Sequence, residues 1–254
     1  MGVYVYVDGF NLYYGALKKT PYRWLDLGAL LTHLIPAKYT VTKIKYFTAH
    51  VSGATDPDAP RRQAIYLNAL RTLPTIEIFY GNFLSKNIWR PLINLPVGNE
   101  TIRSPIPVVL PPGDHVVTGT RKQTVPVGIY PPPGTKRPKA ALQPLPDALV
   151  TLVHAMEEKG SDVNLAAHLI NDAWMNLFDQ AAVISNDTDL TTPVRMVTHD
   201  RRKPVFLICP SQWGASPKLR KVSTWVRHIR PAMLAASQFP DPIPGTSLAK
   251  PPKW

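Results

Sequence analysis

Four aspartates are the residues whose type and spacing most clearly suggest chemistry: Asp8, Asp162, Asp187 and Asp189. Carboxylate oxygens suit hard cations such as Mg²⁺ or Mn²⁺. Carboxylates that lie close together repel one another, so such a group needs a cation or shared protons. A cation held there polarises a phosphodiester and activates a water molecule for in-line attack. The residue types therefore predict a metal site with hydrolytic chemistry.

Each aspartate also has a purely structural interpretation. Asp8 precedes a glycine and could simply form a turn. Asp162 and Asp187 could cap helices, and Asp189 could complement the N-terminus of a helix. If all four lie at one edge of a sheet, the functional interpretation is favoured over four separate structural ones.

The elements around these residues suggest such an edge. The apolar run Ala181–Ile184 leads into Ser185 and Asp187, and its length and composition predict a buried strand. The segment Val3–Val7 alternates valine and tyrosine, predicts another strand, and ends at Asp8. Ligands of open parallel sheets bind just outside the carboxyl ends of the strands. Asp8 and Asp187 are therefore expected at a ligand-binding edge.

The rest of the pattern alternates strands with helices. It predicts further strands at residues 41–50, 75–80, 205–208 and 225–229, and helices at residues 12–18, 25–34, 57–73, 147–159, 162–177 and 191–199. This alternation predicts an α/β fold, a Rossmann-like three-layer sandwich with a mainly parallel central sheet.

The segment from Pro91 to Pro146 has a different composition. It holds thirteen of the 28 prolines, which disfavours helices and interior strands over most of its length. We expect a Pro-rich insertion at about 91–146, with short edge strands at Pro107–Leu110 and Val125–Tyr130. The tail at about 239–254 is also rich in proline and is expected to be extended.

The composition is that of a globular protein. The hydrophobic fraction is 44%, and no apolar run approaches the length of a membrane span. The chain enters a strand pattern at once, so we expect no targeting segment. The single cysteine, Cys209, excludes an internal disulfide framework and a thiolate metal cluster. We expect one cytoplasmic domain over residues 1–254, with no membrane association.

The net charge of +12 favours a polyanionic partner, although a solvated basic surface is the alternative. Eleven basic residues lie between Arg195 and the C-terminus, against only two acidic ones. Arg201, Arg202 and Lys203 flank the elements that follow the Asp187 motif, so we expect them to bind phosphate groups. A solvated turn before the next strand is the alternative for this triplet.

Three motifs resemble those of NYN-domain proteins, especially the LabA-like branch of the PIN-like nuclease superfamily. They are V-Y-V-D-G-F-N-L-Y at residues 5–13, E-E-K-G-S-D-V-N-L-A at residues 157–166, and A-V-I-S-N-D-T-D-L at residues 182–190. The resemblance covers roughly residues 2–81 and 152–254. It implies a PIN-like fold and a metal-dependent ribonuclease site in which Asp8, Asp162, Asp187 and Asp189 hold Mg²⁺ or Mn²⁺.

Polar neighbours would complete the site that this resemblance implies. Asn11 would orient Asp8 or contact a phosphate, and its alternative role is a helix cap. Ser185 would add a hydroxyl group or merely end its strand, and Thr188 would help to bind phosphate. Tyr13, Tyr14 and Trp24 could stack on bases, but core packing is the commoner role of such residues, so they are left out of the site.

The sequence thus predicts a Mg²⁺- or Mn²⁺-dependent ribonuclease. The main alternative is a non-catalytic RNA-binding or regulatory module that retains the fold. A phosphatase of another Rossmann-like class is disfavoured, because Phe10 stands where such enzymes usually have a second aspartate. The expected partner is RNA, single-stranded or structured, and a homodimer is an open alternative.

Overall fold

A computed structural model describes residues 1–53, 56–93, 107–109, 119–129, 141–252 and 254. The chain divides into two compact units. The first unit is Met1–Phe83 together with Glu158–Trp254, and the second unit is Leu84–Glu157. All residues that the sequence analysis assigns to a site belong to the first unit.

The first unit is built on six strands that are parallel to their neighbours, in the order β3-β2-β1-β7-β8-β9. Their bounds are β1 Gly2–Asp8, β2 Thr40–Thr48, β3 Ile76–Tyr80, β7 Gln180–Ile184, β8 Val205–Cys209 and β9 Trp225–His228. The predicted α/β class with a parallel central sheet is confirmed. Successive strands add outward in opposite directions from β1 and from β7, so the topological switch point lies between these two strands.

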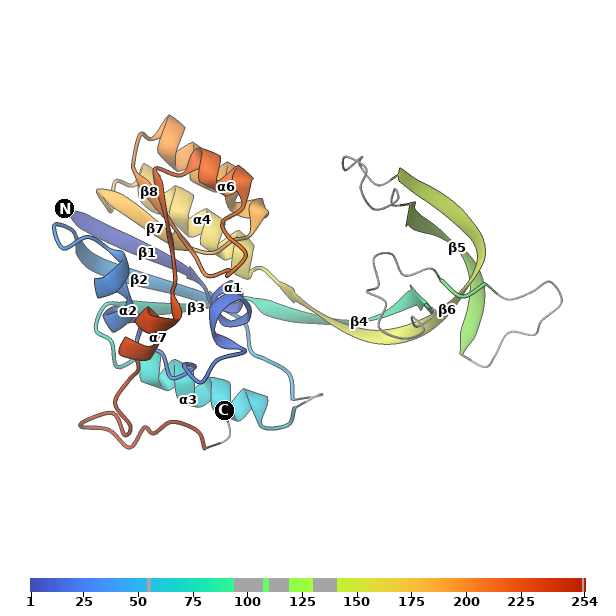
Figure 1. The fold of residues 1–254 in the computed structure, drawn as a ribbon, viewed down its shortest axis with the longest axis horizontal. Helices are drawn as coiled ribbons and strands as arrows, with labels where there is room; N and C mark the ends of the chain where they lie inside the picture. Colours follow the sequence, from blue (N-terminus) through green and yellow to red (C-terminus); the bar gives the residue numbers. More distant parts are fainter. Residues whose placement is uncertain (54–55, 94–106, 110–118, 130–140, 253) are drawn as a thin grey trace. The chain divides into compact units, whose positions relative to one another are not determined.

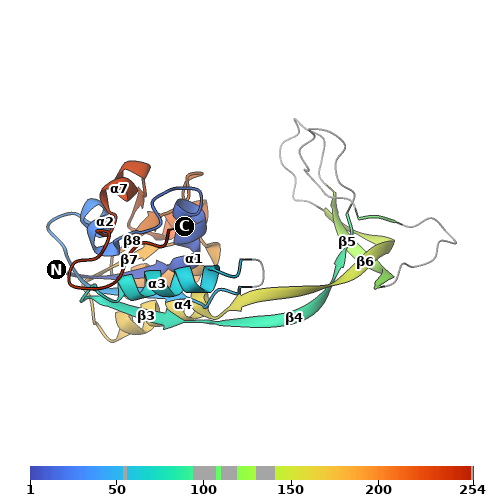
Figure 2. The same cartoon turned by 90° about the horizontal axis from the view of Figure 1, so that it is seen from below.

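Helices cover both faces of this sheet, as Figures 1 and 2 show. One face carries α2 (Leu27–Leu34), α3 (Ala59–Leu70) and α7 (Pro231–Ala236), and the other carries α4 (Ser161–Trp174), α5 (Thr191–Arg195) and α6 (Pro217–Val222). The short helix α1 (Gly9–Leu12) leaves the end of β1 and continues as a π-helical turn, η1 (Tyr13–Leu17). The three layers agree with a Rossmann-like sandwich.

The alternation in β1 explains why two cores form. Val3, Val5 and Val7 are buried in the cluster that contains α2 and α3. Tyr6 is buried in the opposite cluster, against α4, and Tyr4 packs at its border. Successive side chains of a strand point to opposite faces, so this strand supplies apolar groups to both layers.

The second unit contains a three-stranded sheet in the order β4-β6-β5. Its strands are β4 Asn82–Pro91, β5 Thr120–Ile129 and β6 Ala141–Lys159. The expected edge strand at Val125–Tyr130 is present within β5, except that Tyr130 lies outside the described residues. At the other expected edge strand, Pro107 and Val109 form isolated bridges, and Leu110 again lies outside the described residues.

The helix predicted at Asp147–Lys159 is wrong, because these residues form the second half of β6. The run Leu149–Val153 contains β-branched residues, and pairing with β5 overrides the helical pattern. Pro146 is accommodated by a bulge: Asp147 has φ +54°, and the register shifts where β5 passes from Gln123 to Val125.

The C-terminal tail packs on the first unit. Phe239 and Ile243 are buried, and the Phe239 amide donates a hydrogen bond of 2.9 Å to the carbonyl oxygen of Trp24. The rings of Trp24 and Trp254 meet edge to face, with centroids 5.8 Å apart. The tail therefore belongs to the core of this unit. Within the described part of the chain, no helix is long and apolar enough to cross a bilayer.

Candidate functional site

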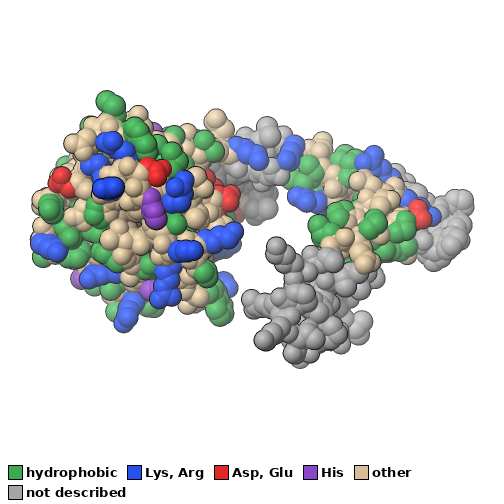
Figure 3. Space-filling view, turned by 90° about the horizontal axis from the view of Figure 1, so that it is seen from above, with side chains coloured by type: hydrophobic (Ala, Val, Ile, Leu, Met, Phe, Trp, Pro, Cys, Tyr) green, Lys and Arg blue, Asp and Glu red, His purple; other side chains and the backbone are tan. Residues whose placement is uncertain are grey.

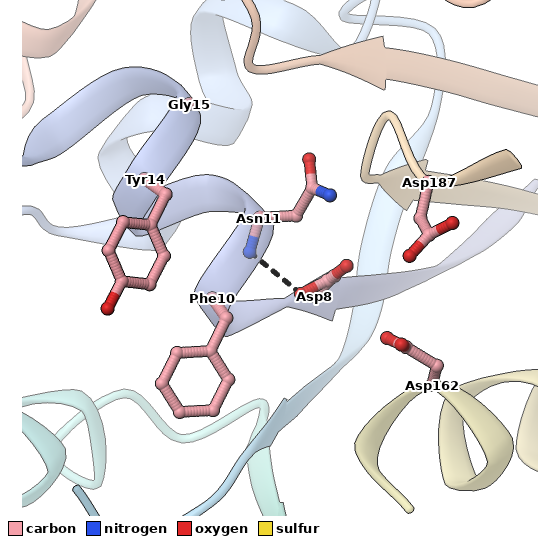
Figure 4. A pocket seen from close by; sticks show the side chains of 7 residues that line it. All are labelled: Asp8, Phe10, Asn11, Tyr14, Gly15, Asp162 and Asp187. Carbon is pink, nitrogen blue, oxygen red and sulfur yellow. Dashed lines mark hydrogen bonds between the residues drawn. The ribbon is translucent and has the colours of Figure 1, made fainter. Parts of the chain in front are cut away.

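A pocket with a cavity volume of about 280 Å³ lies at the carboxyl edge of the sheet, at the switch point between β1 and β7. Figure 4 shows the side chains that surround it, contributed by the end of β1, α1, η1, the loop after β7 and the first turn of α4. The lining residues are Asp8, Phe10, Asn11, Tyr14, Gly15, Asp162 and Asp187.

Asp8 is the most deeply placed acid of the pocket, with only 5% of its surface exposed. It caps α1: its Oδ1 accepts a hydrogen bond of 2.9 Å from the Asn11 amide. Its Oδ2 accepts a second bond of 2.9 Å from the Ser185 hydroxyl, which is itself fully buried. Both carboxylate oxygens are thus bonded to the protein, as a buried charge requires.

The turn after Asp8 requires glycine because the chain passes directly over β2. A Cβ on Gly9 would lie 2.7 Å from the Tyr46 hydroxyl oxygen and 2.8 Å from the Phe47 carbonyl oxygen. Burial, and secondly the negative charge of Asp8, raise the pKa of Tyr46. The phenol therefore stays neutral beneath the turn.

We expect Gly9→Ala to lower the free energy of unfolding by about 1–3 kcal/mol, because the added methyl group overpacks this contact. Urea denaturation measures the change. Gly2→Ala, at the start of β1, is the matched control, since the nearest neighbour of its Cβ would be the Thr42 hydroxyl at 3.4 Å. Equal stability of the two variants would contradict the close approach at Gly9.

Asn186 ties the pocket to the loop after β8. Its amide donates to the Asn11 side-chain oxygen at 3.0 Å. Its side chain donates to the Gly214 carbonyl at 3.2 Å and accepts from the Ser216 amide at 2.7 Å. One side chain thus fixes the ends of two neighbouring strands relative to each other, and Asn11 is held by the same bonds.

Asp187 follows directly and caps the 3₁₀ turn η2 (Thr188–Leu190). Its Oδ1 accepts from the Asp189 amide at 2.9 Å, and its own amide donates to the Ser185 hydroxyl at 3.1 Å. The capping role considered for Asp187 is therefore present alongside its position in the pocket. Thr188 and Asp189 are exposed and do not line the pocket.

Asp162 reaches the pocket from the first turn of α4. Gly160 makes this position possible, because its φ of +95° turns the chain from β6 into α4. The end of β3 lies close by: a Cβ on Gly81 would be 2.7 Å from the Lys159 carbonyl oxygen and 2.9 Å from the Ser161 amide. Glycine at this position lets α4 start next to the sheet edge.

The structure therefore brings together Asp8, Asn11, Asp162 and Asp187, with Ser185 bonded to Asp8. In Figure 4 the carboxylates of Asp8, Asp162 and Asp187 point toward a common space. The predicted convergence of acids at the carboxyl edge is observed for these three residues.

The basic triplet lies elsewhere. Arg201 donates from Nε to the Ala173 carbonyl at 3.3 Å, and the Lys203 ammonium group donates to the Phe178 carbonyl. These partners end α4 and precede β7, so the triplet lies at the amino edge of the sheet, opposite the pocket; Arg202 is exposed. On the face of the first unit that Figure 3 shows, Lys and Arg side chains are spread out, with few acidic side chains between them.

An aromatic wall was missed by the sequence analysis. Phe10 and Tyr14 stack with ring centroids 6.4 Å apart and an interplanar angle of 22°. Tyr14 is 61% exposed and lines the pocket, so core packing does not describe it, whereas Trp24 is buried as expected. The sequence does carry a signal for this wall: Phe10 and Tyr14 are four residues apart, so a helix that begins after Asp8 places them on one face. Lys18 extends this wall, with its ammonium nitrogen 4.7 Å from the centroid of the Tyr14 ring.

The expected Mg²⁺ or Mn²⁺ site is not supported. Among the residues that the structure describes, no group of three or more His, Cys, Asp or Glu side chains is arranged to hold a metal ion. Both oxygens of Asp8 accept hydrogen bonds, from the Asn11 amide and the Ser185 hydroxyl. A hydrogen-bonded acid of this kind serves as a fixed polar group of the pocket.

Fold and site together define an α/β protein with a small, acidic and aromatic pocket at its switch point. No protein-family model matches the chain. The chain is 28% identical to 6-hydroxy-3-succinoylpyridine 3-monooxygenase HspA of Pseudomonas putida (strain DSM 28022 / S16), over 98% of this chain and 74% of that protein. A solved structure of a protein of unknown function from Vibrio parahaemolyticus RIMD 2210633 covers 91% of the chain, with 16% identity and a TM-score of 0.46.

These comparisons correct the functional prediction. The relative is named as a monooxygenase, an oxidoreductase, and the match extends over nearly the whole chain. The predicted metal-dependent ribonuclease is therefore wrong, and so is the expected Mg²⁺ or Mn²⁺ cofactor. Acids at strand ends and the resemblance to NYN-domain motifs both favour metal ligands when only the sequence is considered, although the same acids can serve as hydrogen-bond acceptors for a small molecule.

Proposed function

We propose that this protein is a monooxygenase that inserts one oxygen atom into a small aromatic or heteroaromatic substrate bound in the pocket between β1 and β7. The observation that carries the proposal is the 28% identity to a named monooxygenase over 98% of this chain. That relative acts on a hydroxylated pyridine ring, and we extend the class of substrate, a single ring with polar substituents, to this protein.

The pocket suits such a substrate. Its cavity volume of about 280 Å³ is just below the usual range for small-molecule sites, which fits a small ligand. Phe10 and Tyr14 offer aromatic surfaces, against which a flat ring packs in offset or edge-to-face geometry. The acids on the other side offer acceptors for a ring hydroxyl or a ring N–H group.

The reaction puts one atom of O₂ on a ring carbon and reduces the other to water, with two electrons and two protons from a reductant. At a carbon that carries hydrogen, C–H becomes C–OH. At C3 of 6-hydroxy-3-succinoylpyridine the new C–O bond replaces the ring–acyl bond, and the acyl group leaves to water as a carboxylic acid. Removal of the proton from a ring hydroxyl makes the ring richer in electrons and so more reactive toward oxygen. Asp187 is the acid we assign to this proton, because it lines the pocket and is only partly buried, whereas both oxygens of Asp8 are already bonded. Asp8 and Asn186 are positioning residues in this scheme.

A redox cofactor such as a flavin often supplies O₂ chemistry. The turn between β1 and α1 does not fit the pyrophosphate of a dinucleotide. Its sequence, D-G-F-N-L-Y-Y-G, lacks the glycine pattern of such turns. The Asn11 amide at the start of α1, which would face a phosphate, already donates a hydrogen bond of 2.9 Å to the Asp8 carboxylate. The electrons in this proposal therefore come from a reduced nicotinamide or reduced flavin supplied in solution.

Isotope incorporation tests the proposal. The protein is incubated with 6-hydroxy-3-succinoylpyridine, NADH and flavin under ¹⁸O₂, and we expect a product that carries one ¹⁸O atom by mass spectrometry.

We expect Asp187→Asn to lower turnover about 100-fold or more, as loss of a general base does. Asp189→Asn is the matched control, because Asp189 is exposed outside the pocket. Wild-type protein without ¹⁸O incorporation, or equal turnover in the two variants, would contradict the assignment.

The remaining expectations from the sequence stay proposals. We propose that the finer fold type is PIN-like, supported by three acids at the strand and helix ends that the motifs predict. Cytoplasmic location, RNA as a partner and a homodimer are also kept only as predictions.

A further inference from the structure

The pocket of the first unit has two chemically different sides. Asp8, Asp162 and Asp187 lie on one side, and the aromatic wall of Phe10 and Tyr14 lies on the other, as Figure 4 shows. The three carboxylates repel any negatively charged group of a ligand that comes close to them. A substrate with a carboxylate must therefore direct that group away from the acids and past the aromatic wall.

A cation, Lys18, lies next to the aromatic wall. The ammonium nitrogen of Lys18 lies 4.7 Å from the centroid of the Tyr14 ring, on the wall itself. Lys18 is exposed and Tyr14 is 61% exposed, so both are open to a ligand. Among the described residues, no salt bridge that the structure shows engages the Lys18 ammonium group.

The backbone of Lys18 is fixed by two hydrogen bonds. The Lys18 amide donates to the Tyr13 carbonyl at 2.8 Å and ends the π-helical turn. Arg23 donates from its guanidinium group to the Lys18 carbonyl oxygen. The residue is therefore anchored at the end of η1, on the same turn that presents Tyr14 to the pocket.

We propose that Phe10, Tyr14 and Lys18 form the specificity-determining side of the pocket and select an aromatic ring that carries a short carboxylate tail. The ring packs against the aromatic wall, and the tail pairs with the Lys18 ammonium group outside the acidic cavity. This inference rests on the proposed function, because it assumes that a ring substrate occupies this pocket, and it adds which substituent is recognised and by which residue.

Binding measurements separate the two parts of the ligand. Isothermal titration is performed with 6-hydroxy-3-succinoylpyridine and with 6-hydroxy-3-acetylpyridine, which has the same ring and no carboxylate. We expect Lys18→Glu to weaken binding of the carboxylate by about tenfold, which corresponds to about 1.4 kcal/mol, and to leave the acetyl compound unchanged. Tyr14→Ala is expected to weaken both compounds to a similar extent, because it removes the ring contact.

Lys19→Glu is the matched control. It makes the same change of charge one residue further on, at another exposed position. An effect of Lys18→Glu no larger than that of Lys19→Glu would overturn the inference, because general electrostatics would then explain it. Circular dichroism verifies that the variants fold, as expected for exposed side chains.

The outcome also separates this inference from the proposed reaction. Carboxylate-dependent binding that requires Lys18, in a protein without ¹⁸O incorporation, would retain the specificity assignment and refute the monooxygenase. Incorporation of ¹⁸O with an unchanged KM in Lys18→Glu would retain the monooxygenase and refute the role of Lys18.

Discussion

Replacement of Asp172 by alanine is expected to lower the free energy of unfolding by about 3–5 kcal/mol, the range found when one partner of a buried ion pair is removed. Asp172, on α4, accepts from the Lys45 ammonium group at 2.6 Å and from the Tyr6 hydroxyl at 2.7 Å. The side chains of Lys45 and Asp172 are only 8% and 3% exposed. The substitution would leave a buried cation and a buried hydroxyl without this acceptor.

The surroundings make this loss large. Burial and the bond to Asp172 raise the pKa of Tyr6, so its hydroxyl remains a donor. The Lys45 nitrogen also lies 3.3 Å from His168 Nδ1, and burial, followed by the charge of Lys45, lowers the pKa of that histidine. The imidazole thus stays neutral at pH 7 and cannot compensate for a missing carboxylate.

A matched pair on the same strand provides the control. Lys43 and Glu77 also approach to 2.6 Å, but their side chains are 31% and 45% exposed. We expect Glu77→Ala to change stability by about 1 kcal/mol or less. The double variant Lys45→Met with Asp172→Leu is expected to recover most of the loss, because the unpaired charge is gone. Similar losses in Asp172→Ala and Glu77→Ala, by urea denaturation, would refute the argument from burial.

Trp24→Ala is the second variant with a large expected effect, a loss of about 3–5 kcal/mol as for other buried large aromatic residues. Trp24 is 1% exposed and packs on Tyr66, Phe239 and Trp254, with ring centroids 6.4, 5.7 and 5.8 Å away. Its indole N–H donates to the Pro240 carbonyl at 3.2 Å. The variant therefore creates a cavity and also releases the C-terminal tail.

Release of the C-terminal tail can be measured separately from the loss of stability. Limited proteolysis of Trp24→Ala is expected to cleave after the last helix, α7, faster than in the wild type. Trp213→Ala is the control of the same residue type, because Trp213 is 90% exposed, and it should change stability by about 0.5 kcal/mol or less. A tail that resists cleavage in Trp24→Ala would show that other contacts hold it.

The sequence predicted the first unit well because its strands are short apolar runs bounded by polar residues. Ala181–Ile184 and Val205–Ile208 are buried in the parallel sheet, as their composition requires. Asp26, near the start of the predicted second helix, caps α2: its side chain accepts a hydrogen bond of 3.1 Å from the Ala29 amide. Local pattern and global fold agree at these positions.

The failures have physical causes too. The strand β6 carries a helical pattern in Asp147–Lys159, and only its pairing with β5 decides its structure. The exposure of Tyr14 depends on where α1 leaves the sheet, which periodicity does not show. Arg201–Lys203 follow the Asp187 motif in sequence, but residues that precede a parallel strand lie at the edge opposite to those that follow one.

The contact at Gly81 has a consequence for chain connectivity. The polypeptide leaves the first unit just after this residue and returns just before Ser161, and the two points lie so close that an added Cβ on Gly81 would clash with the Lys159 carbonyl. The intervening residues therefore act as a loop whose ends are already joined in the folded sheet. The free-energy cost of loop closure depends only weakly on loop length, so we expect the first unit to tolerate a longer or shorter segment between Gly81 and Ser161.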